Sequence, residues 1–300
     1  MNTGNNVSVR TLKAMLGDYP NTLALKQGRV RDPGLAFEFA DVKVPQNAFK
    51  RVVRDVEFDV AELAIATYLT AKAHGKPLVL LPVVVQGKFQ HESIVCRAGE
   101  ALTPADLAGR KVGIRSYSVT TVTWVRGILQ NEYGVDLDKV QWVTFEDAHV
   151  AEITDPAGYV RAAANKDMES MLLAGEIDAA VMSGAQLQDP RLQSLIPNPA
   201  AAAQAWYQRH HAVPVNHMVV MRQSLLEAEP ELAQRVFRLL VDARKAAPPA
   251  GDGVERFPQG VDAMRNSLEL IIQYAVQQGL IPRKFTVDEL FSDVTRRLVP

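Results

Sequence analysis

The chain has 300 residues, 47% of them hydrophobic, which is enough to bury one large core or two of moderate size. Its 33 lysines and arginines nearly balance 34 aspartates and glutamates, giving a net charge of −1, so we expect neither a nucleic-acid-binding nor a membrane-binding face. The single cysteine, Cys96, cannot form an internal disulfide, and no Cys/His spacing fits a structural zinc site.

The sequence lacks recognisable targeting segments and short catalytic motifs, and these absences exclude several classes of protein. Residues 1–16 lack the charged, apolar and small-residue regions of an export signal, so we expect a cytoplasmic protein. The apolar run at residues 78–85 is too short to span a bilayer and predicts a buried strand. Dinucleotide-binding, P-loop, zinc-protease and nucleophile-elbow motifs do not occur, so we expect no cofactor, no metal and a small-molecule ligand.

Apolar strand-like segments alternate with amphipathic helical ones along the chain, which favours an α/β fold. Strands are predicted at residues 7–15, 35–39, 58–63, 78–85, 93–97, 111–114, 140–144, 177–182 and 215–221. Helices are predicted at residues 45–54, 66–74, 120–133, 166–174, 200–210, 231–246, 261–278 and 287–298. No fixed-period repeat is apparent.

Residues 103–127 combine a buried strand with the hydroxyl-rich start of a helix. Arg115 follows the strand, and Thr120 and Thr121 stand where the helix begins. A guanidinium, hydroxyl groups and unpaired backbone N–H groups thus meet at a helix N-terminus, where anions are stabilised. We expect this segment to bind a carboxylate.

Two polar positions stand out in or beside apolar strands near the start of the chain. Glu62 interrupts the apolar run at residues 58–63, so its carboxylate must be paired, solvated or protonated. Proton transfer and a structural ion pair with an arginine both fit this pattern. Asp18 and Tyr19 follow Gly17 at the end of the first predicted strand, where either a ligand-binding loop or a plain turn is expected.

Two histidines lie beside strand ends. His91 precedes the strand at residues 93–97, and His217, next to Asn216, begins the strand at residues 215–221. Histidine transfers protons near neutral pH, although a lone histidine is usually structural or exposed. Two of them at strand ends permit a shared site.

Several longer segments together are recognisable. They read LGDYPNTLALKQGRV at residues 16–30, FDVAELAIATYL at 58–69, FQHESIVCR at 89–97, TPADLAGRKVGI at 103–114, TWVRGILQNEYGV at 123–135, LLAGEIDAAV at 172–181 and VPVNHMVVMR at 213–222. On these segments the chain resembles the 4,5-dihydroxyphthalate decarboxylase family. It departs from the family pattern at Arg115-Ser116-Tyr117, where relatives commonly have Pro-Glu-Tyr, and at Ser183-Gly184-Ala185, where they often have Ser-Pro-Arg.

The resemblance implies a fold. It is the α/β, two-lobed fold of type II periplasmic binding proteins, with a ligand cleft between the lobes. Residues 1–97 and 215–300 would form the first lobe, and residues 98–214 would be inserted as the second. Apolar stripes on the C-terminal helices could in addition support a homo-oligomer.

The resemblance also implies an activity. The chain would be a cofactor-independent carboxy-lyase that converts 4,5-dihydroxyphthalate, an aromatic dicarboxylate, to protocatechuate and CO2. The ring carbon that carries the carboxylate would be protonated, with His91 as donor and Glu62 or His217 at the phenol. Substrate binding would involve Asp18, Tyr19, Thr67, Phe89, Arg115, Tyr117, Thr120, Thr121 and Asn216.

The alternative is a binding protein without catalytic activity. Such a protein, of the type that serves ABC transporters, would capture a small anion or an aromatic acid. It needs hydrogen-bond donors and an arginine but no proton-transfer group. A second arginine, Arg126, lies one to two turns into the helix at residues 120–133. Unlike Arg115, it could pair with an acidic residue of the protein.

Overall fold

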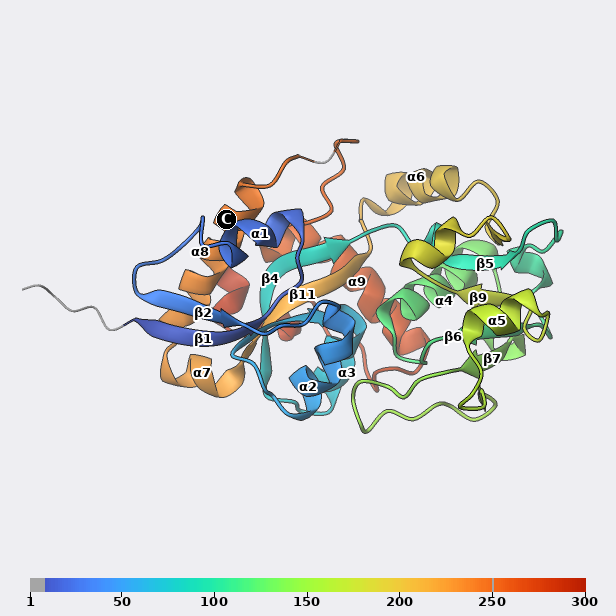
Figure 1. Cartoon of the computed structure of the whole chain (residues 1–300), viewed down its shortest axis with the longest axis horizontal. Helices are drawn as coiled ribbons and strands as arrows, with labels where there is room; N and C mark the ends of the chain where they lie inside the picture. Colours follow the sequence, from blue (N-terminus) through green and yellow to red (C-terminus); the bar gives the residue numbers. More distant parts are fainter. Residues whose placement is uncertain (1–8, 250) are drawn as a thin grey trace, which may run out of the picture. The chain divides into compact units, whose positions relative to one another are not determined.

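The computed structural model describes residues 9–249 and 251–300, which form two compact units. The first unit takes in the described residues up to Gly87 together with Val215–Arg265 and Phe285–Pro300, and the second takes in Lys88–Pro214 and Asn266–Lys284. Each unit contains one mixed β-sheet with helices packed on it (Figure 1). No helix among these residues is both long and apolar enough to cross a membrane.

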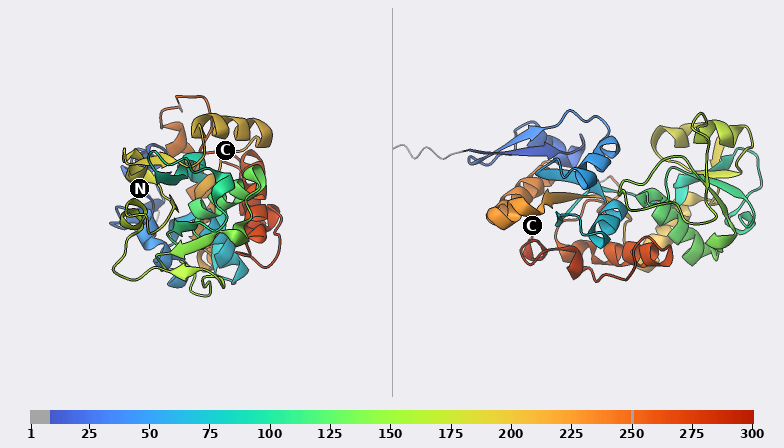
Figure 2. Two further views of the ribbon diagram at one scale, coloured as in Figure 1. Left: turned by 90° about the vertical axis from the view of Figure 1, so that its right-hand side faces the viewer. Right: turned by 90° about the horizontal axis from the view of Figure 1, so that it is seen from below.

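The sheet of the first unit has the order β2-β1-β3-β11-β4. Its strands are β1 (Arg10–Met15), β2 (Leu35–Phe39), β3 (Val60–Ala64), β4 (Leu78–Gly87) and β11 (Val215–Arg222). β1 runs parallel to β2 and β3, and lies beside β2 in both Figure 1 and the right-hand view of Figure 2, whereas β11 runs antiparallel to β3 and β4. The end of β3 and the start of β11 therefore lie side by side at one end of the strands, and β1 also ends on this side of the sheet.

Helices cover both faces of this first sheet. They are α1 (Pro20–Lys26), α2 (Phe49–Arg54), α3 (Ile65–Ala73), α7 (Gln223–Ala228) and α8 (Glu231–Lys245). α1 packs against α8 on one side, and α2 and α3 lie on the other (Figure 1). The apolar residues of α8 join those of α1, β1, β4 and β11 in one core, which fixes the strand ends that carry the candidate site.

The sheet of the second unit has the order β10-β5-β9-β6-β7-β8. Its strands are β5 (Ile94–Arg97), β6 (Lys111–Ile114), β7 (Gln141–Thr144), β8 (Val160–Arg161), β9 (Ala179–Val181) and β10 (Leu192–Ser194). Neighbouring residues of a strand face opposite sides of a sheet, and Ile94 and Cys96 accordingly join the core under α4 (Thr120–Tyr133), whereas Val95 joins the core beside α5 (Met168–Leu173). The sheet is thus buried on both faces.

Two further helices complete the described residues. α6 (Pro199–His210) belongs to the second unit, and α9 (Val261–Gln277) begins in the first unit and continues in the second. The α/β pattern of the sequence is therefore correct, but the boundary predicted after Arg97 is wrong. β5 pairs with β9 and β10 in the second sheet, so the division falls between Gly87 and Lys88. Residues 266–284 also belong to the second unit, and Met1–Ser8, predicted in part as strand, lie outside the described residues.

A close approach of two helices in the second unit predicts a large effect of one methyl group. A Cβ atom at Gly127 of α4 would lie 2.0 Å from Cδ2 of Tyr274 in α9. Although alanine is the better helix former, we expect Gly127→Ala to lower the free energy of unfolding by about 1–3 kcal/mol through overpacking. Urea unfolding measures this change.

The matched control is Gly251→Ala. No described atom lies within 4 Å of a Cβ built there, and the backbone is outside the left-handed region. This variant should stay within about 0.5 kcal/mol of wild type. Equal stabilities of both variants would contradict the packing described for α4 and α9.

Candidate functional site

The sheet of the first unit brings three distant parts of the chain together where its inner strands begin or end. β1 ends at Met15, so residues 16–19 lie beside the end of β3. In the antiparallel pair of β3 and β11, His217 is opposite Ala64 and Val219 is opposite Glu62. The side chains of Glu62 and His217 are therefore diagonal neighbours on one face of the sheet, within reach of each other.

Glu62 is fully buried and has hydrogen-bond donors at both carboxylate oxygens. Its Oε2 accepts from the backbone N–H of Gly17 at 2.8 Å. Its Oε1 accepts from the Tyr19 hydroxyl at 2.7 Å and lies 2.5 Å from Nδ1 of His217. An ionised carboxylate accepts hydrogen bonds only, and this arrangement of partners is the one that it requires in a buried place.

His217 is held from two sides. The Glu62 carboxylate contacts Nδ1, and the ring of Phe49 lies edge-on at a centroid distance of 5.1 Å. With an ionised Glu62, the proton of a neutral His217 ring belongs on Nδ1, so that Nε2 is the nitrogen that takes up a second proton and can then pass it on. Glu62 can thus orient the ring and stabilise its protonated form, as the acid of a carboxylate–histidine pair does.

The loop between β1 and α1 is fixed by side chains of α1. The Thr22 hydroxyl donates to the Gly17 carbonyl at 2.7 Å, and Lys26 Nζ donates to the Leu16 carbonyl at 2.7 Å. Lys26 also forms an ion pair with Asp18. Burial, followed by the Glu62 carboxylate, raises the pKa of the Tyr19 hydroxyl above its usual value, so this group is protonated and donates at neutral pH.

The other predicted site residues of the first unit are Asp18, Thr67 and Asn216. Asp18 is largely exposed and is bound to Lys26, not held toward Glu62. Thr67 is buried in α3. Asn216 is buried and adjacent to His217 in β11, where the pairing with β4 is irregular. The structure therefore brings Glu62, His217 and Tyr19 together.

His91 belongs to the second unit, in a 3₁₀ turn that precedes β5. The ring is buried against Trp206, at a centroid distance of 6.1 Å, and Nδ1 has no hydrogen-bond partner in the described part of the chain. Burial lowers the pKa of His91 to about 4. The ring is therefore neutral at pH 7 and lacks the proton that the predicted donor role requires. Phe89 packs edge-on against Tyr207, 6.0 Å away.

The predicted carboxylate-binding segment also lies in the second unit. α4 begins at Thr120 as predicted, with Thr120 buried and Thr121 partly exposed. Arg115 is 34% exposed, and its Nε lies 3.4 Å from the Glu146 carboxylate. The Tyr117 hydroxyl donates to the Gln278 carbonyl, and burial raises its pKa. The Tyr117 hydroxyl is thus engaged with a backbone carbonyl, whereas Nε of Arg115 is within ion-pair distance of Glu146 but has no hydrogen-bond partner among the described residues.

Arg126 is a buried cation with an unusual set of partners. It donates to the Tyr159 hydroxyl at 2.8 Å and to the Tyr117 carbonyl at 2.6 Å, and its guanidinium lies over the rings of Tyr117 and Trp142. Within residues 9–249 and 251–300 we find no carboxylate bonded to it. The expectation that Arg126 pairs with an acid is therefore wrong. Its place on the apolar face of the helix was the sequence signal for burial.

Gly17 also contacts Glu62, although the site predicted from the sequence does not include it. Its N–H reaches Glu62, and the absence of a side chain leaves room for the ring of Tyr19. The signal for it was present, because a glycine directly after a strand often marks a close backbone approach. Among the described residues, no three His, Cys, Asp or Glu side chains gather as metal ligands would.

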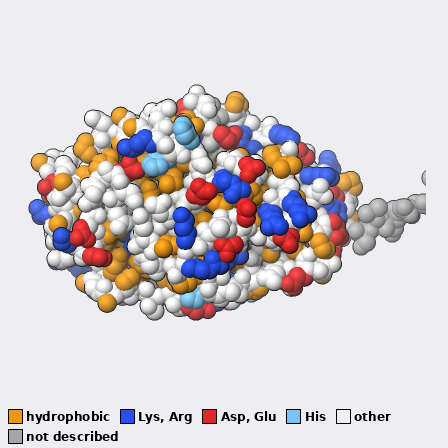
Figure 3. Space-filling view, turned by 180° about the vertical axis from the view of Figure 1, so that it is seen from behind, with side chains coloured by type: hydrophobic (Ala, Val, Ile, Leu, Met, Phe, Trp, Pro, Cys, Tyr) orange, Lys and Arg blue, Asp and Glu red, His pale blue; other side chains and the backbone are white. Residues whose placement is uncertain are grey.

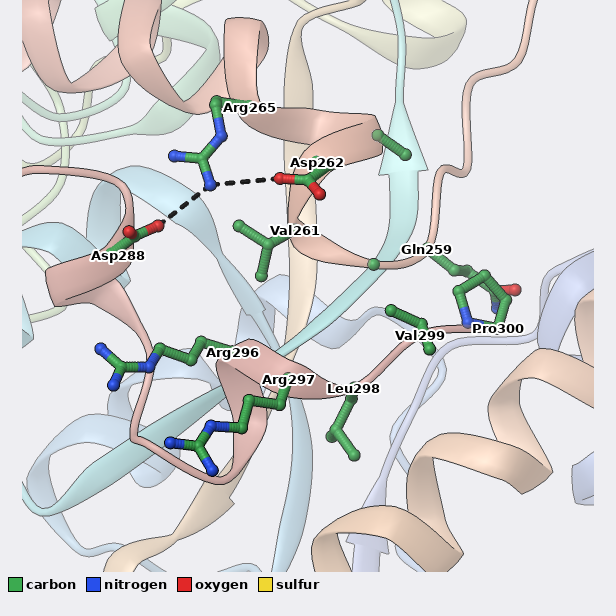
Figure 4. A pocket seen from close by; sticks show the side chains of 12 residues that line it. Gln259, Val261, Asp262, Arg265, Asp288, Arg296, Arg297, Leu298, Val299 and Pro300 are labelled. Atoms are coloured by element: carbon green, nitrogen blue, oxygen red, sulfur yellow. Dashed lines mark hydrogen bonds and ion pairs between the residues drawn. The ribbon is translucent and has the colours of Figure 1, made fainter.

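A separate pocket of about 420 Å³ lies near the start of α9 in the first unit (Figure 4). Arg265 binds Asp262 and Asp288 there, and Arg296 and Arg297 line another side. None of the predicted site residues lines it. Acidic and basic side chains are interspersed on the molecular face shown in Figure 3, as the near-neutral charge suggests.

Comparison with known proteins relates the chain to enzymes and binding proteins. It is 30% identical over 234 residues to the 4,5-dihydroxyphthalate decarboxylase of Comamonas testosteroni, covering 74% of this chain and 71% of the relative. It is 29% identical over 209 residues to the decarboxylase of the same name from Pseudomonas putida, covering 65% of this chain and 81% of that protein. No family model matches the sequence.

Solved structures show the fold. The periplasmic aliphatic sulfonate-binding protein SsuA of Escherichia coli matches 95% of this chain and 98% of its own, with a TM-score of 0.63 at 15% identity. The desulfurization enzyme DszB matches 95% and 97%, with a TM-score of 0.58 at 14% identity. The predicted periplasmic-binding-protein-like α/β fold is confirmed. By its sequence, the chain belongs to the 4,5-dihydroxyphthalate decarboxylase family.

Proposed function

We propose that the protein is a cofactor-independent decarboxylase of a hydroxylated aromatic dicarboxylate, with 4,5-dihydroxyphthalate as substrate and protocatechuate and CO2 as products. The relatives carry the name of this activity. The observation that carries the proposal is the pairing of buried Glu62 with His217 at 2.5 Å. A binding protein has no need of such a pair, whereas a proton-transfer reaction does.

The chemistry sets out what the site must supply. Direct loss of CO2 would leave an aryl carbanion, so the ring carbon that carries the carboxylate is protonated first. Electrons from the hydroxyl para to this carbon move into the ring as the proton arrives. The bond to the carboxylate then breaks, its electron pair restores the aromatic ring, and CO2 leaves. The net reaction consumes one proton, and a positioned acid typically accelerates such a step by about 10²–10⁴-fold.

We assign the proton transfer to Nε2 of His217. Glu62 accepts from its neighbours and orients the ring through Nδ1, so it serves as the supporting carboxylate. His91, the donor favoured by the sequence, is buried with an unpartnered Nδ1, and its pKa of about 4 leaves it neutral at pH 7. In the second unit, the start of α4 with Thr120 and Thr121 stays our proposed carboxylate-binding group.

The competing function is reversible binding of a small anion without turnover. Its support is the likeness in fold to sulfonate-binding proteins such as SsuA. The same fold is also found in the desulfurization enzyme DszB, so fold does not separate the two functions. The buried Glu62–His217 pair favours the enzyme, because a receptor for an anion has no use for a proton-transfer group.

Turnover of 4,5-dihydroxyphthalate tests the proposed function. Purified protein mixed with 4,5-dihydroxyphthalate should release CO2 and form protocatechuate, and chromatography measures the product. The reaction should also proceed when a chelator is present. His217→Gln removes the proton-transfer atom and should lower kcat by about 10²–10⁴-fold, and Glu62→Gln by about tenfold or more. His74→Gln, at an exposed position beyond the end of α3, should keep wild-type activity.

Thermal unfolding of each variant separates loss of function from loss of structure. Tight binding of the substrate without CO2 release would contradict the enzyme and support the receptor. Full activity of folded His217→Gln would refute the assignment of the proton-transfer group.

The neutral state of His91 makes the stability of the protein depend on pH. Its pKa of about 4 in the folded protein lies below the usual 6.5, so the unfolded chain binds the proton first as the pH falls. This contribution to stability is present above pH 6.5 and is lost as the pH falls toward about 4, by on the order of 3 kcal/mol in all. Urea unfolding of His91→Gln at pH 7 and pH 5 should show a weaker pH dependence than wild type.

Decarboxylation adds a second readout at the same position. A folded His91→Gln should retain most of its kcat, because the proposed proton transfer does not pass through this ring. Parallel stability curves for the two proteins would argue against a neutral, buried His91, and a loss of kcat as large as that of His217→Gln would restore its donor role.

A further inference from the structure

Gly17 and Tyr19 meet on the loop that follows β1. A Cβ atom built at Gly17 would lie 2.4 Å from Cζ of Tyr19 and 2.5 Å from its hydroxyl oxygen. The three nearest atoms all belong to this one side chain. The backbone of Gly17 is outside the left-handed region, so alanine would meet no backbone strain there. The ring of Tyr19 thus occupies the space that a side chain at residue 17 would need.

The same two residues hold the two oxygens of one carboxylate. Gly17 donates its N–H to Oε2 of Glu62 at 2.8 Å, and Tyr19 donates its hydroxyl to Oε1 at 2.7 Å. Oε1 is also the oxygen that lies beside Nδ1 of His217. The Tyr19 hydroxyl is therefore engaged with a protein group, which differs from the substrate contact that the sequence predicted.

We propose that Gly17 and Tyr19 act as one positioning device: the missing side chain of Gly17 gives the Tyr19 ring its place, and the Tyr19 hydroxyl then holds the Glu62 carboxylate against His217. The catalytic consequence rests on the proposed function, because it matters only if His217 transfers a proton. Any side chain at residue 17 displaces the ring, and the hydroxyl then leaves Glu62. A small shift of a group that orients a reacting atom lowers kcat by about ten- to a hundredfold.

A double-mutant cycle of stability tests the device without substrate. Gly17→Ala should lower the urea midpoint in the wild-type background, because the methyl group collides with the ring. In a Tyr19→Ala background the ring is absent, and the same Gly17→Ala change should leave the midpoint unchanged or raise it. Equal falls in both backgrounds would overturn the proposal.

A kinetic cycle tests the positioning role. Tyr19→Phe should lower kcat by about ten- to a hundredfold while KM stays unchanged, and Gly17→Ala should do the same. The double variant Gly17→Ala/Tyr19→Phe should be no slower than the slower single variant, since the lost bond is shared. A raised KM with an unchanged kcat would show that Tyr19 contacts substrate and would overturn the positioning role.

The control is Tyr68→Phe, which removes another buried hydroxyl of the first unit, one that donates to the Leu290 carbonyl at 2.5 Å. It should lower stability and leave kcat unchanged. The stability cycle shows whether Gly17 and Tyr19 act together or independently, and it does so even if the wild-type protein fails to turn over 4,5-dihydroxyphthalate. Absence of turnover with a coupled stability cycle would refute the proposed function and leave the Gly17–Tyr19 pairing standing.

Discussion

The buried carboxylate of Glu62 constrains much of the first unit. An ionised carboxylate without water is strongly destabilising unless donors surround it, and an unpaired one would cost several kcal/mol. Here the donors come from the loop after β1 and from β11, 45 and 155 residues away in sequence. Three features therefore place donors around this one buried carboxylate: the register between β3 and β11, the course of the loop after β1, and the absence of a side chain at Gly17. The residues that satisfy Glu62 are also the ones that orient His217.

Sequence reasoning found the separate groups of this site but not their partnership. Glu62 was visible because a charged residue interrupts an apolar run, and His217 because it begins an apolar strand. Their contact depends on an antiparallel pairing between strands that are far apart in the chain, which periodicity does not encode. For the same reason the boundary after Arg97 was wrong, since β5 finds its partners β9 and β10 more than 80 residues later. His91 was placed correctly beside a strand, but its neutral state follows from burial by Trp206, which local sequence does not reveal.

The fold permits several functions, and the site decides among them. Binding proteins for sulfonates and a desulfurization enzyme share this architecture with the chain at 14–15% identity. A receptor needs donors that match an anion. An enzyme that protonates an aromatic ring needs in addition a positioned proton donor, and a histidine is suited to this role when a partner at one ring nitrogen fixes the other. The first unit contains such a histidine, and its fixed orientation links the buried charge of Glu62 to the proposed chemistry.

The tautomer of His217 tests the pairing of Glu62 with His217 most directly. Protein labelled with nitrogen-15 in its histidines, with His217→Gln used to assign the signal, shows by NMR which ring nitrogen carries the proton. If Glu62 orients the ring, Nδ1 of His217 carries a proton that is hydrogen-bonded to the Glu62 carboxylate, the proton given to the substrate is a second one on Nε2, and Glu62→Gln loses this pattern. A neutral His217 with its proton on Nε2, or a signal that Glu62→Gln leaves unchanged, would contradict the central role given to the Glu62–His217 pair.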